Sequence, residues 1–65
     1  MKFKEYDLVK LKEGQSGLEV GVVGVVVMTY EKPPAYEVEF CDDEGITIQL
    51  LTLKEDSLEL EKSGD

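Results

Sequence analysis

The 65-residue sequence contains one cysteine, no histidine, no arginine and no tryptophan. Because Cys41 is alone, the chain can form neither an internal disulfide nor a zinc site built from cysteine and histidine. A domain of about 60 residues buries only about 60% of the surface that its unfolded chain exposes. The stability of this protein must therefore come from good packing or from association with another chain.

Basic residues are also few. The chain has seven lysines and 15 acidic residues, so the formal net charge is −8. Arginine, the planar side chain that reads phosphate and guanine, is absent. A nucleic acid would be repelled unless the lysines gather on one face. Nucleic-acid binding is therefore disfavoured, and it would require a common face for Lys2, Lys4, Lys10, Lys12, Lys32, Lys54 and Lys62.

Long apolar segments are missing as well. No stretch approaches the roughly 20 apolar residues of a membrane span, and the first residues turn acidic without the apolar core of a signal peptide. We therefore expect a cytoplasmic protein that does not bind a membrane. We expect one domain over residues 1–61, followed by a disordered tail at residues 62–65.

What the sequence does contain is alternation of apolar and polar residues with a period of two, which is typical of strands. Strands are predicted at residues 7–12, 22–30, 36–40, 46–53 and 58–61, with a single helical turn at residues 54–57. A flat sheet of this size would leave one apolar face and two edges exposed. The pattern therefore predicts an all-β fold, a small five-stranded antiparallel barrel that is partly open.

Gly24 interrupts the longest apolar run, and a glycine inside a strand commonly marks a bulge. A bulge reverses the face that later side chains occupy. The interior is then predicted to receive Val23, Val26, Met28 and Tyr30. Other strands are predicted to add Val9, Leu11, Tyr36, Val38, Phe40, Ile46, Ile48, Leu50, Leu58 and Leu60. Five apolar residues are left pointing outward, namely Leu8, Val22, Val25, Val27 and Leu51.

These five outward residues are a candidate interface. Adjoining β-branched side chains on one strand form an apolar patch, which marks either a subunit contact or a surface covered by another part of the chain. We therefore predict a non-enzymatic protein interaction module that binds a second copy of itself or a different protein. The alternative is that the loop at residues 13–20, or a terminus, folds over the patch.

Three polar or loop clusters are weaker candidates. Charged residues at Glu37, Glu39, Glu59 and Glu61 are a candidate acidic surface for a basic partner, or simply keep the protein soluble. A candidate loop contact of the kind that binds proline-rich peptides is formed by Tyr30, Pro33, Pro34 and Tyr36, which alternatively cap one end of the fold. The acidic cluster at Asp42, Asp43 and Glu44 lacks calcium-loop spacing and is interpreted as a hairpin turn.

Catalysis is not expected. Paired carboxylates need a desolvated pocket to act as acid and base, and a barrel of this size is filled by its own side chains. Cys41 has no histidine to activate it and is followed by two acids. We predict no catalytic residue, no metal and no cofactor.

Several segments together resemble a known family. These are KEYDLVKL at residues 4–11, VGVVGVVV at residues 20–27, YEVEF at residues 36–40, DEG at residues 43–45, LTL at residues 51–53 and DSL at residues 56–58. They are similar to the small bacterial family of domains of unknown function numbered four-nine-two-six, and the similarity spans nearly the whole chain. The resemblance implies an SH3-like barrel and no particular chemistry.

A second, more distant similarity concerns the bend in the valine run. The pattern Gly-x-x-Gly-x-Val at residues 21–26 is similar to the KOW segment of ribosomal and transcription-elongation proteins. That similarity implies an alternative function, a nucleic-acid or ribonucleoprotein accessory barrel, although the usual KOW surface is basic and this chain is acidic.

Overall fold

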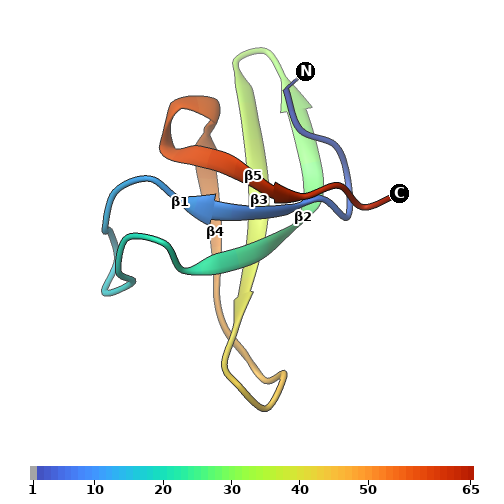
Figure 1. The fold of residues 1–65 in the computed structure, drawn as a ribbon. Coiled ribbons are helices and arrows are strands. Elements are labelled where there is room, and N and C mark those ends of the chain that lie inside the picture. Colours follow the sequence, from blue (N-terminus) through green and yellow to red (C-terminus); the bar gives the residue numbers. More distant parts are fainter. Residues whose placement is uncertain (1) are drawn as a thin grey trace.

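The computed structural model describes residues 2–65, which form five antiparallel strands (Figure 1). The strands are β1 (Leu8–Leu11), β2 (Val23–Glu31), β3 (Pro34–Cys41), β4 (Thr47–Lys54) and β5 (Leu58–Lys62). A short 3₁₀ turn, η1 (Glu55–Ser57), joins β4 to β5. The all-β class, the five antiparallel strands and the helical turn before the last strand are confirmed.

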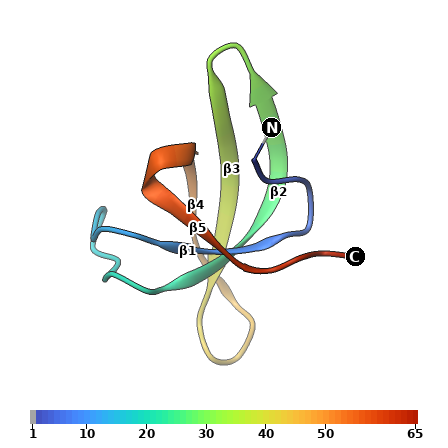
Figure 2. The ribbon, with the colours of Figure 1, turned by 45° about the horizontal axis from the view of Figure 1, so that its top comes forward.

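All five strands belong to one sheet in the order β4-β3-β2-β1-β5. The sheet curls so that β1 and β5 cross in front of β3, while the β2–β3 hairpin and the β3–β4 turn project at opposite ends (Figure 2). The expected barrel does not close through hydrogen bonds, because β4 and β5 stand at the two ends of this order and are not paired with each other. The fold is a strongly curved open sheet with two edges.

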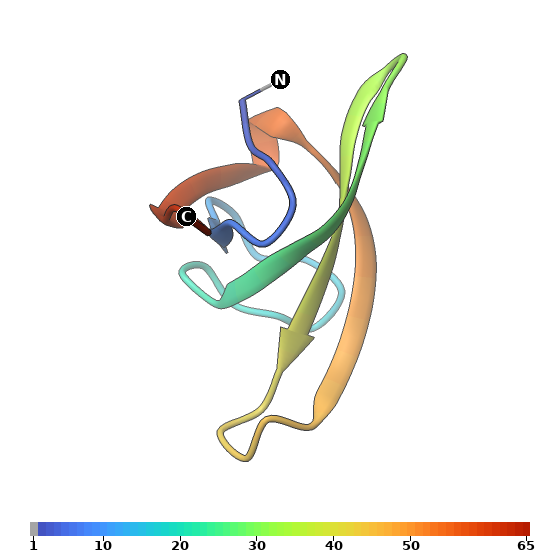
Figure 3. The same ribbon diagram turned by 90° about the vertical axis from the view of Figure 1, so that its right-hand side faces the viewer.

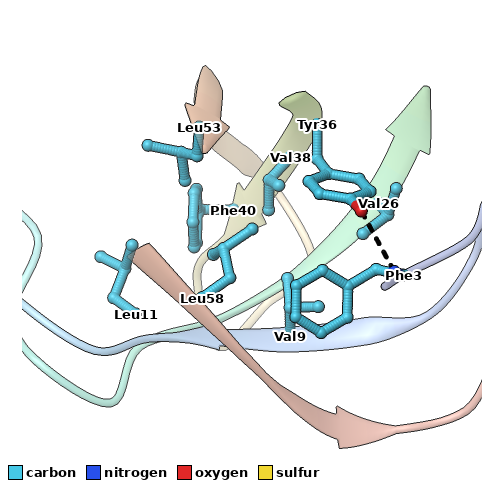
Figure 4. Packing of buried hydrophobic residues seen from close by; sticks show 9 residues of the cluster. All are labelled: Phe3, Val9, Leu11, Val26, Tyr36, Val38, Phe40, Leu53 and Leu58. Carbon is cyan, nitrogen blue, oxygen red and sulfur yellow. Dashed lines mark hydrogen bonds between the residues drawn. The ribbon is translucent and has the colours of Figure 1, made fainter. Parts of the chain in front are cut away.

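The core fills the concave side of this sheet (Figure 4). Along β3 the alternating residues Tyr36, Val38 and Phe40 are fully buried, as their spacing predicted, because successive side chains of a strand point to opposite faces. The other buried apolar residues come from the N-terminal segment and the remaining strands: Phe3, Val9, Leu11, Val26, Leu53 and Leu58. One curved sheet therefore supplies a single core without a helix layer.

Gly24 does not mark the bulge that was predicted. It is buried, faces the core and is paired with Phe40, and a Cβ atom at this position would lie 2.7 Å from Cγ1 of Val38 and 2.8 Å from the Phe40 ring. The missing side chain therefore makes room for the Phe40 ring, and the strand alternates regularly from residue 22 to residue 26.

The bulges lie elsewhere. In β2 the extra residue is Val27, between the pairs Val26–Val38 and Met28–Glu37. In β4 the extra residue is residue 48, since residue 49 pairs with residue 40 and residue 47 with residue 41. Each bulge adds one residue and therefore changes which side chains face the core. Seven side chains predicted to point inward are exposed, and those predictions are wrong: Val23, Met28, Tyr30, Ile46, Ile48, Leu50 and Leu60.

The N-terminal segment closes one end of the core. The rings of Phe3 and Tyr36 meet edge to face with centroids 5.2 Å apart. The Tyr36 hydroxyl accepts hydrogen bonds from the backbone N–H groups of Lys2 (3.1 Å) and Phe3 (3.2 Å), and donates one to the Glu55 carboxylate. Burial and this last hydrogen bond raise the pKa of the Tyr36 phenol, and the same bond lowers the pKa of Glu55.

Replacing Tyr36 with phenylalanine tests this closure. The Tyr36→Phe change keeps the ring but leaves the buried Phe3 N–H without its acceptor, so we expect a loss of about 1–3 kcal/mol in the free energy of unfolding. Urea denaturation measures this loss. The Tyr30→Phe variant, at a tyrosine that is 41% exposed, is the control and should change the free energy by less than about 0.5 kcal/mol. Equal midpoints for both variants would contradict the structural role of the Tyr36 hydroxyl.

Asp7 joins the two ends of the chain. Its carboxylate is buried and accepts hydrogen bonds from the Lys4 N–H (3.0 Å), the Lys4 ammonium (2.8 Å) and the Gly64 N–H (2.9 Å). Burial acts to raise the pKa of Asp7, but these hydrogen bonds outweigh it and the pKa is lowered. The last residues, which the sequence predicts to be disordered, therefore lie against the N-terminal segment, and Lys62 belongs to β5.

Candidate interaction surface

The outer face of the sheet is the side turned away from the core. Residues that are paired across neighbouring strands lie side by side on the same face. One row of such residues crosses four strands and consists of Leu8, Val25, Glu39 and Leu50. A second row consists of Met28, Glu37 and Thr52. We call these two rows, together with Val23 and Tyr30, the outer face.

The outer face is rich in exposed apolar side chains. Those of Val23, Met28, Tyr30 and Leu50 are between 39% and 53% exposed. Leu8 and Val25 are half-buried and line a shallow hollow with Val23, Glu39 and Cys41. An apolar area of this kind on a small domain is a common feature of surfaces that contact other molecules.

The predicted interface is assembled only in part. Leu8 and Val25 are neighbours on the outer face, and Val27, the extra residue of the β2 bulge, is half-buried. Val22 and Leu51 were predicted to point outward, but both pack against the core. The reason is the position of the bulges, because regular alternation across Gly24 keeps residue 22 on the inner face and the bulge at residue 48 turns residue 51 inward.

The sequence interpretation missed the exposed residues Val23, Met28 and Leu50, and it assigned Tyr30 to the interior and to the candidate loop contact. Their residue types are those of a core, and no local signal in the valine run marks Val27 as the bulged position. The loop at residues 13–20 does not cover them, since its Leu18 packs against the core and the backbone oxygen of Ser16 accepts a hydrogen bond from Gln49 (2.6 Å). The outer face is thus left open by that loop.

Two carboxylates lie in the middle of the outer face. Glu39 is paired with Val25 on one side and Leu50 on the other, and Glu37 is paired with Met28 and with Thr52, whose hydroxyl donates a hydrogen bond to it. No ion pair found within residues 2–65 includes either glutamate. Both negative charges are therefore available to a positive group brought by another molecule.

Glu59 and Glu61, predicted to lie beside these glutamates, are separate from them. They belong to β5, and strands β1 and β2 intervene between β5 and β3. The Lys10 ammonium lies 3.9 Å from Glu59 and 3.4 Å from Glu61, so their charge is partly neutralised within the chain. The candidate acidic surface therefore divides into two parts, with Glu37 and Glu39 at the centre of the outer face and Glu59 and Glu61 beside Lys10 at the β5 edge.

The candidate loop contact is also divided. Pro33 and Pro34 line a groove with residues 35 and 52–56, beside the cis peptide between Lys32 and Pro33. Tyr36 was predicted to line such a groove but is fully buried in the core, because β3 turns it toward Phe3. Tyr30 lies on the outer face, paired with Ala35. These four residues do not form one aromatic and proline-lined groove.

The acidic turn between β3 and β4 has a structural explanation. One carboxylate oxygen of Asp42 accepts the N–H groups of Glu44 and Ile46, both at 2.9 Å, and Gly45 has the positive φ of 82° that the turn requires. In the part of the chain that the structure describes, no three Asp, Glu or Cys side chains gather closely enough to hold a metal ion. Cys41 is exposed, with its sulfur 3.9 Å from a Glu39 oxygen.

The lysines are spread over several elements, and two of them are paired with carboxylates. Lys4 contacts Asp7 (2.8 Å) and Asp65 (3.6 Å), and Lys10 contacts two glutamates of β5. Of the others, Lys32 lies in the β2–β3 turn and Lys54 ends β4. Nucleic-acid binding would require a shared basic face, and two of the seven lysines of the chain, Lys4 and Lys10, already contact carboxylates.

Comparisons with known proteins identify a family but no activity. No helix within residues 2–65 has the length and apolar character needed to cross a membrane. Neither the curated proteins nor the solved structures include a significant match. A family model described as "Domain of unknown function (DUF4926)" matches residues 5–60, from the segment before β1 into β5. The chain therefore belongs to this family of domains of unknown function.

Proposed function

We propose that the protein is a non-enzymatic interaction module that binds another protein through the outer face of its sheet. The observation that supports this proposal is the exposure of core-type side chains on one face, including Val23, Met28 and Leu50. Such residues are costly to leave in water, at about 25 cal/mol per Å² of apolar surface. Covering them with a partner would recover that free energy.

The two outer-face glutamates indicate the chemistry of the partner. Glu39 lies between Val25 and Leu50, and Glu37 lies beside Met28, so a partner that covers these apolar neighbours also removes the carboxylates from water. Desolvating a carboxylate is costly unless it gains a charged hydrogen-bonding partner. The partner surface should therefore be apolar with one or two lysine or arginine side chains at its centre.

A second copy of this chain is a poor occupant of the outer face. Two outer faces packed against each other would bring four carboxylates together, because each copy contributes Glu37 and Glu39. Like charges that are desolvated together oppose binding. A different protein with basic side chains can cover the outer face and pair with Glu37 and Glu39 without this repulsion.

A photo-crosslinking amino acid placed at Met28 tests the proposal in cells of the native host. We expect discrete adducts with a different protein, because Met28 is exposed beside Glu37 on the outer face. The matched control carries the crosslinker at Val20, which is 66% exposed but lies in the loop before β2. The Glu39→Lys change should lower the Met28 adduct yield at least about fivefold by reversing the charge that the partner meets.

Each outcome of this experiment decides something. Adducts that form from Met28 and not from Val20, and that decrease with Glu39→Lys, support the proposal. The proposal is wrong if Met28 gives no adduct, if both positions give the same adducts, or if Glu39→Lys leaves the yield unchanged while the variant melts as the wild type does.

A further inference from the structure

Strand β4 forms one edge of the sheet, and only its β3 side is occupied by another strand (Figure 3). An edge strand presents backbone N–H and C=O groups that can pair with a further strand. Apolar side chains accompany this edge, since Ile46 is 60% exposed, Ile48 50% and Leu50 53%. This edge shares Leu50 with the outer face, but it uses the free backbone groups of β4, and the inference below does not depend on the proposed function.

The two edges of the sheet differ in how well they are protected against such pairing. Charged residues and bulges are common protective features of edge strands. Strand β5 has five residues, of which Glu59, Glu61 and Lys62 are charged, and its pairing with β1 is irregular. Strand β4 also contains a bulge, at residue 48, but it has eight residues without proline, and residues 46–53 carry no charge. The difference between the two edges therefore lies in charge and length. In a chain with a net charge of −8, this neutral edge is where a second copy meets little repulsion.

The charges at the two ends of β4 are opposite. Lys54 ends the strand, while the acidic turn that contains Asp43 and Glu44 precedes it. If two copies of β4 pair antiparallel about Leu50, residue 54 of one copy (50 + 4) lies across from residue 46 of the other (50 − 4) when every residue is counted. It lies across from residue 45 when the bulged residue 48 is counted as extra. Lys54 then lies beside the acidic turn of the second copy, and two-fold symmetry produces this contact twice. Parallel pairing would instead place the two Lys54 side chains together.

From this complementarity we propose that two copies of the chain associate through antiparallel pairing of their β4 strands into one ten-stranded sheet. The Leu50 side chains of the two copies then meet on the outer side. The Glu39 residues of the two copies are three strand spacings apart, about 14 Å. Their repulsion is screened at this distance, since the Debye length is about 8 Å at physiological salt. The dimer therefore avoids the repulsion that opposes face-to-face packing.

Sedimentation velocity from low to high micromolar concentration tests the dimer. The wild type should sediment faster as its concentration rises, because the edge contact is small and weak. Leu50→Lys should remain monomeric throughout, since a charge on the edge opposes strand pairing. Val20→Lys makes the same replacement at an exposed valine in a loop and should behave as the wild type. Thermal melts establish that each variant is folded.

A charge exchange distinguishes β4 pairing from other contacts. Lys54→Glu should raise the dissociation constant about tenfold, because it turns two attractions into repulsions. Adding Glu44→Lys to Lys54→Glu should restore the wild-type constant. The control, Lys54→Glu with Glu13→Lys, has the same net charge but should stay weak.

Three results would overturn the proposed dimer: a wild type that is monomeric at every concentration, a dimer that survives Leu50→Lys, or equal constants for the two charge-exchange variants. A complex formed only with a strand from a different protein would also overturn it. Because the photo-crosslinking experiment reports on Met28 and a different protein, the two proposals can fail separately.

Discussion

Replacing Gly24 with valine is expected to destabilise the protein by at least about 3 kcal/mol, although valine is the better strand former. Gly24 faces the core, and even a Cβ atom would lie within 2.8 Å of the fully buried Phe40 ring. A chain of this length has a free energy of unfolding of only about 3–10 kcal/mol. The melting temperature should fall by about 12–24 °C in a calorimetric or circular dichroism melt.

A second substitution identifies the cause of that loss. Phe40→Leu removes ring atoms that crowd the new side chain. The free energy of unfolding lost in the double variant Gly24→Val with Phe40→Leu should therefore be smaller, by about 1 kcal/mol or more, than the sum of the losses in the two single variants. Val23→Ile adds volume at the neighbouring exposed position and should change the free energy by less than about 0.5 kcal/mol. Additive effects of the Gly24 and Phe40 changes would contradict the close packing of these two residues.

Replacing Asp7 with asparagine is expected to cost about 1–3 kcal/mol at neutral pH, because the buried carboxylate loses its charge toward Lys4. The pKa of Asp7 is lowered in the folded protein from its ordinary value of 3.8. The Asp7 carboxylate therefore makes its full contribution to the free energy of unfolding at pH values above 3.8. This contribution disappears as the pH falls through the lower pKa that Asp7 has in the folded protein. Urea unfolding at a series of pH values should show the wild type and Asp7→Asn converging in strong acid.

The neighbouring Glu5 provides the control, since its side chain is exposed. Glu5→Gln should unfold at the wild-type urea concentration at every pH. Some acid sensitivity should remain in Asp7→Asn, because the pKa of Glu55 is also lowered, chiefly by its hydrogen bond from Tyr36. A constant difference between the wild type and Asp7→Asn from neutral to strongly acidic pH would mean that the Asp7 charge does not stabilise the fold.

The strands that could be predicted well are those with unbroken alternation. Tyr36, Val38 and Phe40 share one face of β3, and Val9 and Leu11 share one face of β1, as their spacing of two residues indicates. The hairpin turn at residues 42–45 was also evident, because acidic residues and glycine favour tight turns. Local composition was sufficient at these positions, and the family resemblance is confirmed by the match over residues 5–60.

The candidate surface was predictable only in outline. The surplus of apolar residues was correctly noticed, and Leu8 and Val25 do lie on the outer face. Val22 and Leu51 were predicted to point outward and Val23 and Leu50 inward, and the structure shows the reverse. The reason is that a shift of one residue moves a side chain to the other face. The chain has valine at residues 25, 26 and 27, so the sequence offers no reason to place the bulge at Val27 rather than beside Gly24.

Residue types and their spacing along the chain specify five short strands, an acidic surface and more apolar side chains than one small core can hold. Which of those side chains remain in water was decided by the tertiary structure, through the bulges at Val27 and Ile48 and the space that Gly24 leaves for Phe40. The physical reason is that strand register follows from packing between strands distant in sequence, and a single added residue reverses every face beyond it.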